Sequence, residues 1–164
     1  MNALENKTQD NIIDINIGGI SKKRIRVNGD DNKILLLNTN DSSILERFTD
    51  GYSELMEWKD KYIKNMSELK EEADISGIAY WKQIAEVLKP IDSKMREILN
   101  YIFNADVSGI CDGAMYDIVE SGKMRFETIL ETLIELYGDT IANNYKKMSE
   151  RVSDLTKDYV KSDS

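Results

Sequence analysis

The sequence contains no histidine, one cysteine and one proline among its 164 residues. Histidine is the commonest general base and the commonest transition-metal ligand, so its absence removes Ser-His and Cys-His nucleophiles and many metal sites. A single cysteine, Cys111, excludes an internal disulfide and a cysteine metal cage. No dense positive charge lies near Cys111 in the sequence, so we expect a small buried side chain rather than a reactive thiol. The sequence therefore predicts a protein that is not an enzyme and that uses no metal and no cofactor.

Long apolar runs are also missing, and so is an excess of positive charge. No stretch of about 18 apolar residues is present, and the first residues lack the charged-then-apolar pattern of a signal peptide. The net charge is −8, which disfavours binding to nucleic acid or to an anionic membrane. The densest basic cluster, Lys22-Lys23-Arg24 with Arg26, fits the solvated face of a strand better than a phosphate-binding patch. We expect a cytoplasmic protein without nucleic-acid or membrane partners.

The N-terminal part predicts a small antiparallel sheet. Residues 1–10 are polar and lack periodicity, which is typical of a disordered arm. Residues 11–39 hold three short apolar segments, around Ile13–Ile17, Lys23–Val27 and Lys33–Asn38. The residues between the second and third segments begin with Asn-Gly, which favours positive φ in a hairpin turn. We therefore expect a three-stranded β meander.

Residues 41–74 predict one long amphipathic helix, roughly 50 Å in length. A capping box of Ser43 with Glu46 can start it, and Asp41 or Ser42 are alternative caps. Lys59 is the one polar break in its apolar stripe. The stripe itself recurs every three or four residues: Leu45, Phe48, Tyr52, Leu55, Tyr62, Met66, Leu69 and Ala73.

Residues 78–159 predict three to four further helices. The first, residues 78–89, points Ile78, Trp81, Ile84, Ala85 and Leu88 inward, and Pro90 either ends it or starts the next one. Residues 106–122 are irregular with a possible short helix at 114–119, residues 124–137 form a strong amphipathic helix that Gly138 ends, and residues 140–159 form another. Residues 160–164 fray. The fold class is α+β, mostly α, in a single domain over residues 11–159.

The long helix carries the predicted partner-binding residues. Its stripe exceeds what a short local core can cover, so it packs either against this chain's own helices or against a partner or a second copy. Tyr, Trp and Met are enriched around it, and these residue types suit adaptable interfaces. The residues expected to contact a partner are Phe48, Tyr52, Leu55, Trp58, Tyr62 and Met66.

The order of segments resembles a family of phage tail assembly chaperone-like proteins from long non-contractile-tailed phages and prophages of Firmicutes-type bacteria. The residues that carry the resemblance are the turn Val27-Asn28-Gly29-Asp30-Asp31-Asn32-Lys33 and the passage from Leu37-Asn38-Thr39-Asn40-Asp41 into Ile44-Leu45-Glu46-Arg47-Phe48. Residues 106–113, 115–119 and 124–137 fit the family's later segments more loosely.

The resemblance implies a non-enzymatic chaperone. It would bind the tape measure protein and recruit tail tube subunits in the host cell cytoplasm, self-associate as a homo-oligomer, and be absent from the mature virion. Two other classes stay open: a small acidic phage protein that inhibits a host or defence factor, and a structural virion or connector protein. Asp and Glu alternate with Lys and Arg along the helices, which argues against an inhibitor that mimics nucleic acid.

Overall fold

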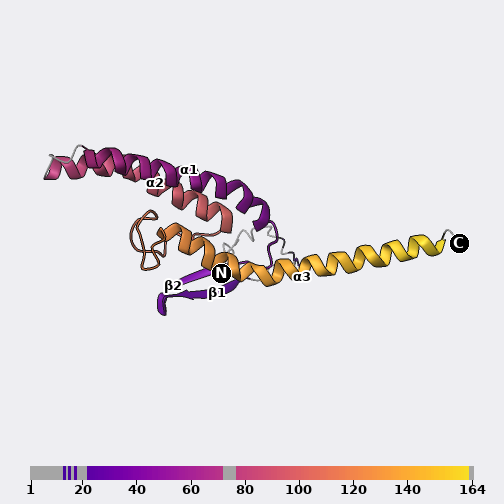
Figure 1. Ribbon diagram of the computed structural model, residues 1–164. Helices are drawn as coiled ribbons and strands as arrows, with labels where there is room; N and C mark the ends of the chain where they lie inside the picture. Colours follow the sequence, from indigo (N-terminus) through magenta and orange to yellow (C-terminus); the bar gives the residue numbers. More distant parts are fainter. Residues whose placement is uncertain (1–12, 14, 16, 18–21, 72–76, 163–164) are drawn as a thin grey trace, which may run out of the picture.

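The computed structural model of the protein describes residues 13, 15, 17, 22–71 and 77–162 (Figure 1). In chain order these residues form β1 (Lys23–Val27), β2 (Asp30–Leu37), α1 (Ile44–Glu71), α2 (Ile78–Phe103) and α3 (Arg125–Ser162). Figure 1 shows α1 and α2 side by side as a long hairpin, while α3 starts beside the strands and runs away in the opposite direction. The distal end of the hairpin and the C-terminal end of α3 therefore lie at opposite ends of the molecule.

The two strands form an antiparallel hairpin whose turn follows from its sequence. Asn28 and Gly29 both have positive φ, at 53° and 72°, as a two-residue hairpin turn requires. The turn prediction is thus confirmed. Val27 pairs with Asp30 and Lys23 pairs with Leu37, which directs one apolar face of the hairpin inward. The core on that face includes Leu35 and Leu37, which are buried.

The predicted three-stranded meander is wrong, because the described residues form a sheet of two strands. Ile13, Ile15 and Ile17 are 86%, 73% and 62% exposed and lie in no strand. Alternation of apolar residues predicts a strand only where an apolar surface lies beside it. Such a surface is not in contact with these three side chains. The predicted arm at residues 1–10, like residues 14 and 16, lies outside the described residues.

The predicted number of later helices is also wrong, because two long helices replace three to four shorter ones. Pro90 lies inside α2, where its exposed ring faces solvent, and the buried Ile91 follows it directly. Gly138 lies inside α3 and does not end it. In a helix interior, glycine costs up to about 1 kcal/mol and proline about 3 kcal/mol relative to alanine. The packing of the apolar stripe on both sides of Pro90 can offset the cost of the proline. The possible helix at residues 114–119 is instead a series of turns.

A glycine brings α1 and α2 into close contact near the base of the hairpin. Gly51 is buried, and a Cβ atom there would lie 2.7 Å from Cγ1 of Ile102 and 3.2 Å from Cγ2 of Ile98. Gly51 is therefore a packing contact between the two helices. The core continues from it through Leu55 and Leu99, both fully buried.

The segment between α2 and α3 has little regular structure, and side chains on one face of α2 hold it. Asn100 accepts hydrogen bonds from the backbone N–H groups of Val107 (2.9 Å) and Ser108 (3.1 Å). Asp92 accepts one from the N–H of Met115 at 2.7 Å. Arg96 pairs with Asp92 at 2.9 Å and donates to the carbonyl of Ser108 at 2.8 Å. These three residues, spaced four apart, form the polar row of α2.

Contacts from the same segment fix the start of α3. The N–H of Phe126 donates to the carbonyl of Met115 at 2.9 Å. Arg125 reaches back to the carboxylate of Asp117 and to the carbonyl of Ala114, both at 3.0 Å. The polar row of α2 therefore positions the segment, and the segment positions α3.

Two glycine substitutions test the packing of the hairpin against helix propensity alone. We expect Gly51→Ala to lower the free energy of unfolding by about 1 kcal/mol, because the cost of overpacking exceeds the gain in propensity. Gly138→Ala is the matched control, since nothing lies within 4 Å of its Cβ position. It should raise the free energy of unfolding by up to about 1 kcal/mol. Urea titration measures both, and equal stabilisation by the two changes would contradict the close contact.

Candidate protein-binding surfaces

The six residues predicted to contact a partner lie on α1, but they do not form one open surface. Leu55 is fully buried in the core. Four others are partly buried, and only Tyr52 is exposed, at 43%. The partly buried four are Phe48, Trp58, Tyr62 and Met66. Much of the stripe therefore packs within this chain. Contact of the six residues with a partner stays a prediction.

The aromatic members of the stripe already have neighbours. Phe48 stacks on Tyr52 with ring centroids 5.4 Å apart. Tyr62 stacks on Tyr116 of the segment after α2 at 4.6 Å, so α1 also helps to hold that segment. Lys61 lies 3.9 Å from the ring centroid of Trp58, a cation–π contact that leaves the indole half-buried.

Lys59, the polar break in the predicted stripe, joins α1 to α3. Its ammonium lies 2.6 Å from the carboxylate of Glu127, and both side chains are mostly buried. Glu127 also accepts a hydrogen bond from the N–H of Met124 at 2.9 Å, which caps the first turn of α3. Burial alone would raise the pKa of the Glu127 carboxyl, but these hydrogen bonds outweigh it and hold the pKa below its ordinary value. In the sequence, the only sign of this ion pair is that Lys59 interrupts an otherwise apolar stripe.

The distal end of the α1–α2 hairpin exposes large apolar side chains. Ile78 is 78% exposed and Trp81 is 77% exposed. On α1, Ile63 is 51% exposed. The sequence pattern predicts that Ile78, Trp81 and Ala85 point inward, and this prediction is wrong because all three are exposed. We call Ile78 and Trp81, with the hollow beside them, the hairpin-tip surface.

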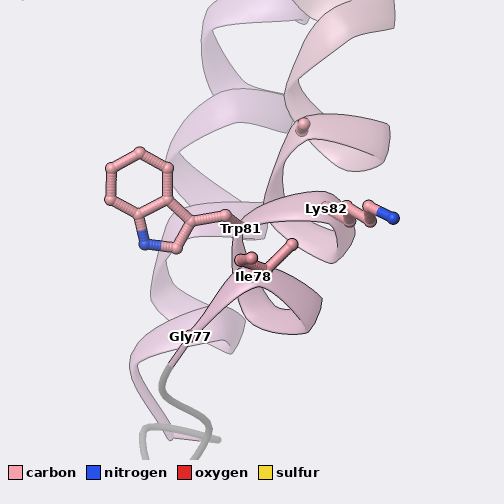
Figure 2. A pocket seen from close by; sticks show the side chains of 5 residues that line it. Gly77, Ile78, Trp81 and Lys82 are labelled. Carbon is pink, nitrogen blue, oxygen red and sulfur yellow. The ribbon is translucent and has the colours of Figure 1, made fainter.

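Figure 2 shows the hollow of the hairpin-tip surface, where the indole of Trp81 stands out from the first turn of α2 and Lys82 points to the other side. The hollow has a volume of about 560 Å³ and is lined by Gly77, Ile78, Trp81, Lys82 and Ala85. Gly77 adopts a φ of 102°, which favours glycine, and its carbonyl accepts the first bond of the helix from the N–H of Trp81 at 3.2 Å. Ile78 and Trp81 are three residues apart and thus lie on one face of α2.

A second hollow lies between the inner face of the β-hairpin and the first turns of α3. Its volume is about 490 Å³, and apolar side chains such as Ile25, Ile129 and Leu136 line it. Arg26, Lys33 and Arg125 also line it, and each is paired with a carboxylate, that of Asp31, Asp112 and Asp117 respectively. Thr128 also lines it, and its buried hydroxyl has no hydrogen-bond partner among the described residues.

Cys111 lines the second hollow but does not have the features of a reactive thiol. It is half-buried, and burial raises the pKa of its thiol despite the nearby Arg125, Arg96 and Lys33. A raised pKa leaves less thiolate at neutral pH, which lowers nucleophilicity. Beside it, Lys33 forms an ion pair with Asp112 on the surface.

The described residues offer little for other chemistry. Among them, no group of three or more Cys, Asp or Glu side chains is placed to hold a metal ion. No helix in the described ranges is long and apolar enough to cross a bilayer. Comparison with protein-family models, with curated proteins and with solved structures finds no match to this chain.

The Lys59–Glu127 pair gives a pH-dependent prediction. A carboxyl with a lowered pKa in the folded state stabilises the fold above its unfolded pKa, about 4.3 for Glu, and loses that contribution as the pH falls through the folded value. We expect Glu127→Gln to lower the free energy of unfolding by about 1 kcal/mol at pH 7, with the difference from wild type shrinking below about pH 4.

Glu131→Gln is the matched control for this change. Glu131 lies one turn further along α3 and pairs with Lys123, but both side chains are about half exposed, at 57% and 48%. Exposed pairs contribute little, so its effect should be near zero at any pH. Urea titrations between pH 3 and pH 7 measure both variants. A Glu127→Gln effect independent of pH would contradict the assigned pair.

Proposed function

We propose that this chain is a non-enzymatic phage tail assembly chaperone that binds the tape measure protein and tail tube subunits. It acts in the host cell cytoplasm and leaves before the virion matures. The observation that carries the proposal is the hairpin-tip surface, where a tryptophan and an isoleucine lie more than three-quarters exposed beside an apolar hollow. Large exposed apolar patches of this kind mark interaction sites.

The hairpin-tip surface fits an amphipathic helix as its partner. Ile78 and Trp81 lie on one helical face, and a client helix can place apolar anchors against them at spacings of three and four residues. A tryptophan beside a hollow is the type of residue that dominates binding energy at interfaces. The tape measure protein of a long-tailed phage is a long helical client with many such faces.

The charge and the rigidity of the rest of the molecule support a chaperone that keeps an apolar client protein in solution. The chain has a net charge of −8, which opposes aggregation of a complex. The strands, the base of the α1–α2 hairpin, residues 104–124 and the first half of α3 form the body of the molecule. The Lys59–Glu127 pair and the polar row of α2 hold the body together, so the tip of the hairpin projects from a fixed base. The resemblance in the turn after β1 and in the entry to α1 supports the same function.

Co-expression with the tape measure protein of the same phage tests the proposal. We expect the two proteins to co-purify and the tape measure protein to stay soluble only when this chain is present. Truncation of a hot-spot aromatic costs about 2 kcal/mol, so Trp81→Ala combined with Ile78→Ala should weaken binding about thirtyfold or more. Titration by fluorescence anisotropy with a labelled tape measure fragment measures the change.

Leu36→Ala combined with Ile118→Ala is the matched control, because these two apolar side chains are also exposed, at 48% and 62%, but lie away from the tip. Their loss should leave the affinity unchanged. Failure of the wild-type chain to bind the tape measure protein would contradict the function. Wild-type affinity in the Trp81 and Ile78 double variant would contradict the site, and a stoichiometric amount of the chain in purified virions would favour a structural component.

A further inference from the structure

The second half of α3 is a long helix segment with an apolar stripe that no described part of the chain covers. All residues from Ala142 to Ser162 are exposed, and Figure 1 shows the helix extending away from the body. The stripe includes two aromatic and three aliphatic side chains. They are Tyr145 (78% exposed), Met148 (61%), Val152 (54%), Leu155 (58%) and Tyr159 (72%).

The spacing of this stripe is that of a coiled coil. From Ile141 to Tyr159 the steps alternate between four and three residues, so the positions repeat every seven residues over the whole segment. A repeat of 3.5 residues keeps the stripe on one side only if two helices wrap around each other. The partner that this pattern selects is therefore another helix with a matching heptad repeat, and a second copy of α3 has one.

We propose that α3 pairs with α3 of a second copy in an antiparallel coiled coil centred on Glu150. In an antiparallel pair, each a position faces a d position of the partner helix. With the centre at residue 150, Val152 faces Met148 of the second copy, Tyr145 faces Leu155, and Tyr159 faces Ile141. Every layer of the stripe is filled, and each tyrosine meets an aliphatic side chain.

The antiparallel arrangement also agrees with where the body begins. Tyr137 is buried in the core, Ile141 is half-buried against that core, and α3 is uncovered from Ala142 onward. In the proposed register, residue 138 of one copy lies opposite Ser162 of the other, so no described residue of one helix runs into the body of the other. A parallel pair would bring two bodies together at the same end and would place Tyr145 on Tyr145 and Tyr159 on Tyr159.

The size of the contact matches a reversible dimer. Burial of roughly 100 Å² for each seam side chain gives a total on the order of 1,200 Å², at the lower edge of stable interfaces. Among the flanking positions, Asn144, Ser149 and Thr156 are uncharged, and the proposed register places Asp158 near Asn144 of the second copy rather than near a carboxylate. At the centre of the proposed pair, Arg151 lies near Arg151 of the second copy. The long side chain of each arginine lets its guanidinium reach water.

Pairing also explains how this part of α3 stays helical. A helix of about 20 residues without tertiary contacts is marginal in water. We therefore expect the helical circular dichroism signal of the full chain to rise with protein concentration, in step with the dimer fraction from analytical ultracentrifugation. The dimer should dominate at about 100 µM and dissociate on dilution to about 1 µM.

Val152→Asp tests the seam, with Ser153→Asp as its matched control on the neighbouring position of the opposite face. We expect Val152→Asp to abolish the dimer at about 100 µM and to remove the concentration dependence of the helical signal, because it buries two carboxylates. Ser153→Asp should dimerise like the wild type. Thermal unfolding of the body should be the same in both variants, since Val152 contacts nothing in it.

Cysteine crosslinking tests the direction of the helices in a Cys111→Ala background. Air oxidation of a mixture of Tyr145→Cys and Leu155→Cys chains should give a disulfide-linked heterodimer, because these positions face each other only in the antiparallel pair. Tyr159→Cys alone should not crosslink. A Tyr159→Cys homodimer would overturn the antiparallel geometry, and a monomer at all concentrations would overturn the proposal. Neither result depends on whether the hairpin-tip surface binds a tape measure protein.

Discussion

The polar row of α2 is the constraint on which the arrangement of the rest depends. The segment from Asn104 to Met124 has few regular backbone hydrogen bonds, yet Val107, Ser108 and Met115 are buried. Buried backbone groups without partners are costly, and here the side chains of Asp92, Arg96 and Asn100 provide those partners. The segment in turn receives the start of α3 through Met115 and Asp117. The direction in which α3 leaves the body follows from these contacts.

The most exposed large apolar side chains of the three helices, Ile78, Trp81, Tyr145 and Tyr159, lie toward the two ends of the molecule. The core takes up most of the α1 stripe, while the hairpin-tip surface and the second half of α3 stay uncovered. The separation of these surfaces is what gives them different roles in our account. We propose that the tryptophan and the hollow at one end bind a client helix, and that the heptad repeat at the other end binds a second copy. A dimer joined through α3 would present two hairpin tips to one long client, and linked sites bind more tightly than single ones.

Sequence patterns predicted those parts of the fold that depend on local chemistry. Asn28-Gly29 specifies its own turn, and the period of the α1 stripe specifies a helix and its inward face. Two of the later errors share a physical origin, because periodicity shows which face is apolar but not whether anything lies against it. Ile78 and Trp81 have the spacing of core residues and lie in the open, and the alternating isoleucines at 13, 15 and 17 likewise contact no sheet. Pro90 and Gly138 were expected to break helices that continue through them. At Pro90 the packing of Leu88 and Ile91 on either side outweighs helix propensity, whereas the residues beyond Ile141 on the C-terminal side of Gly138 are exposed. Lys59 is different, because the residue that interrupts the apolar stripe of α1 forms an ion pair with Glu127 of α3.

Amide hydrogen exchange on the free chain measures whether the polar row of α2 holds the irregular segment in place. If the polar row of α2 holds the irregular segment, the N–H groups of Val107, Ser108 and Met115 are closed by hydrogen bonds and open only when the body unfolds. They should exchange as slowly as amides in the middle of α2, and Asn100→Ala should speed exchange at Val107 and Ser108 first. Exchange of these three amides at the rate of an open loop would contradict the account.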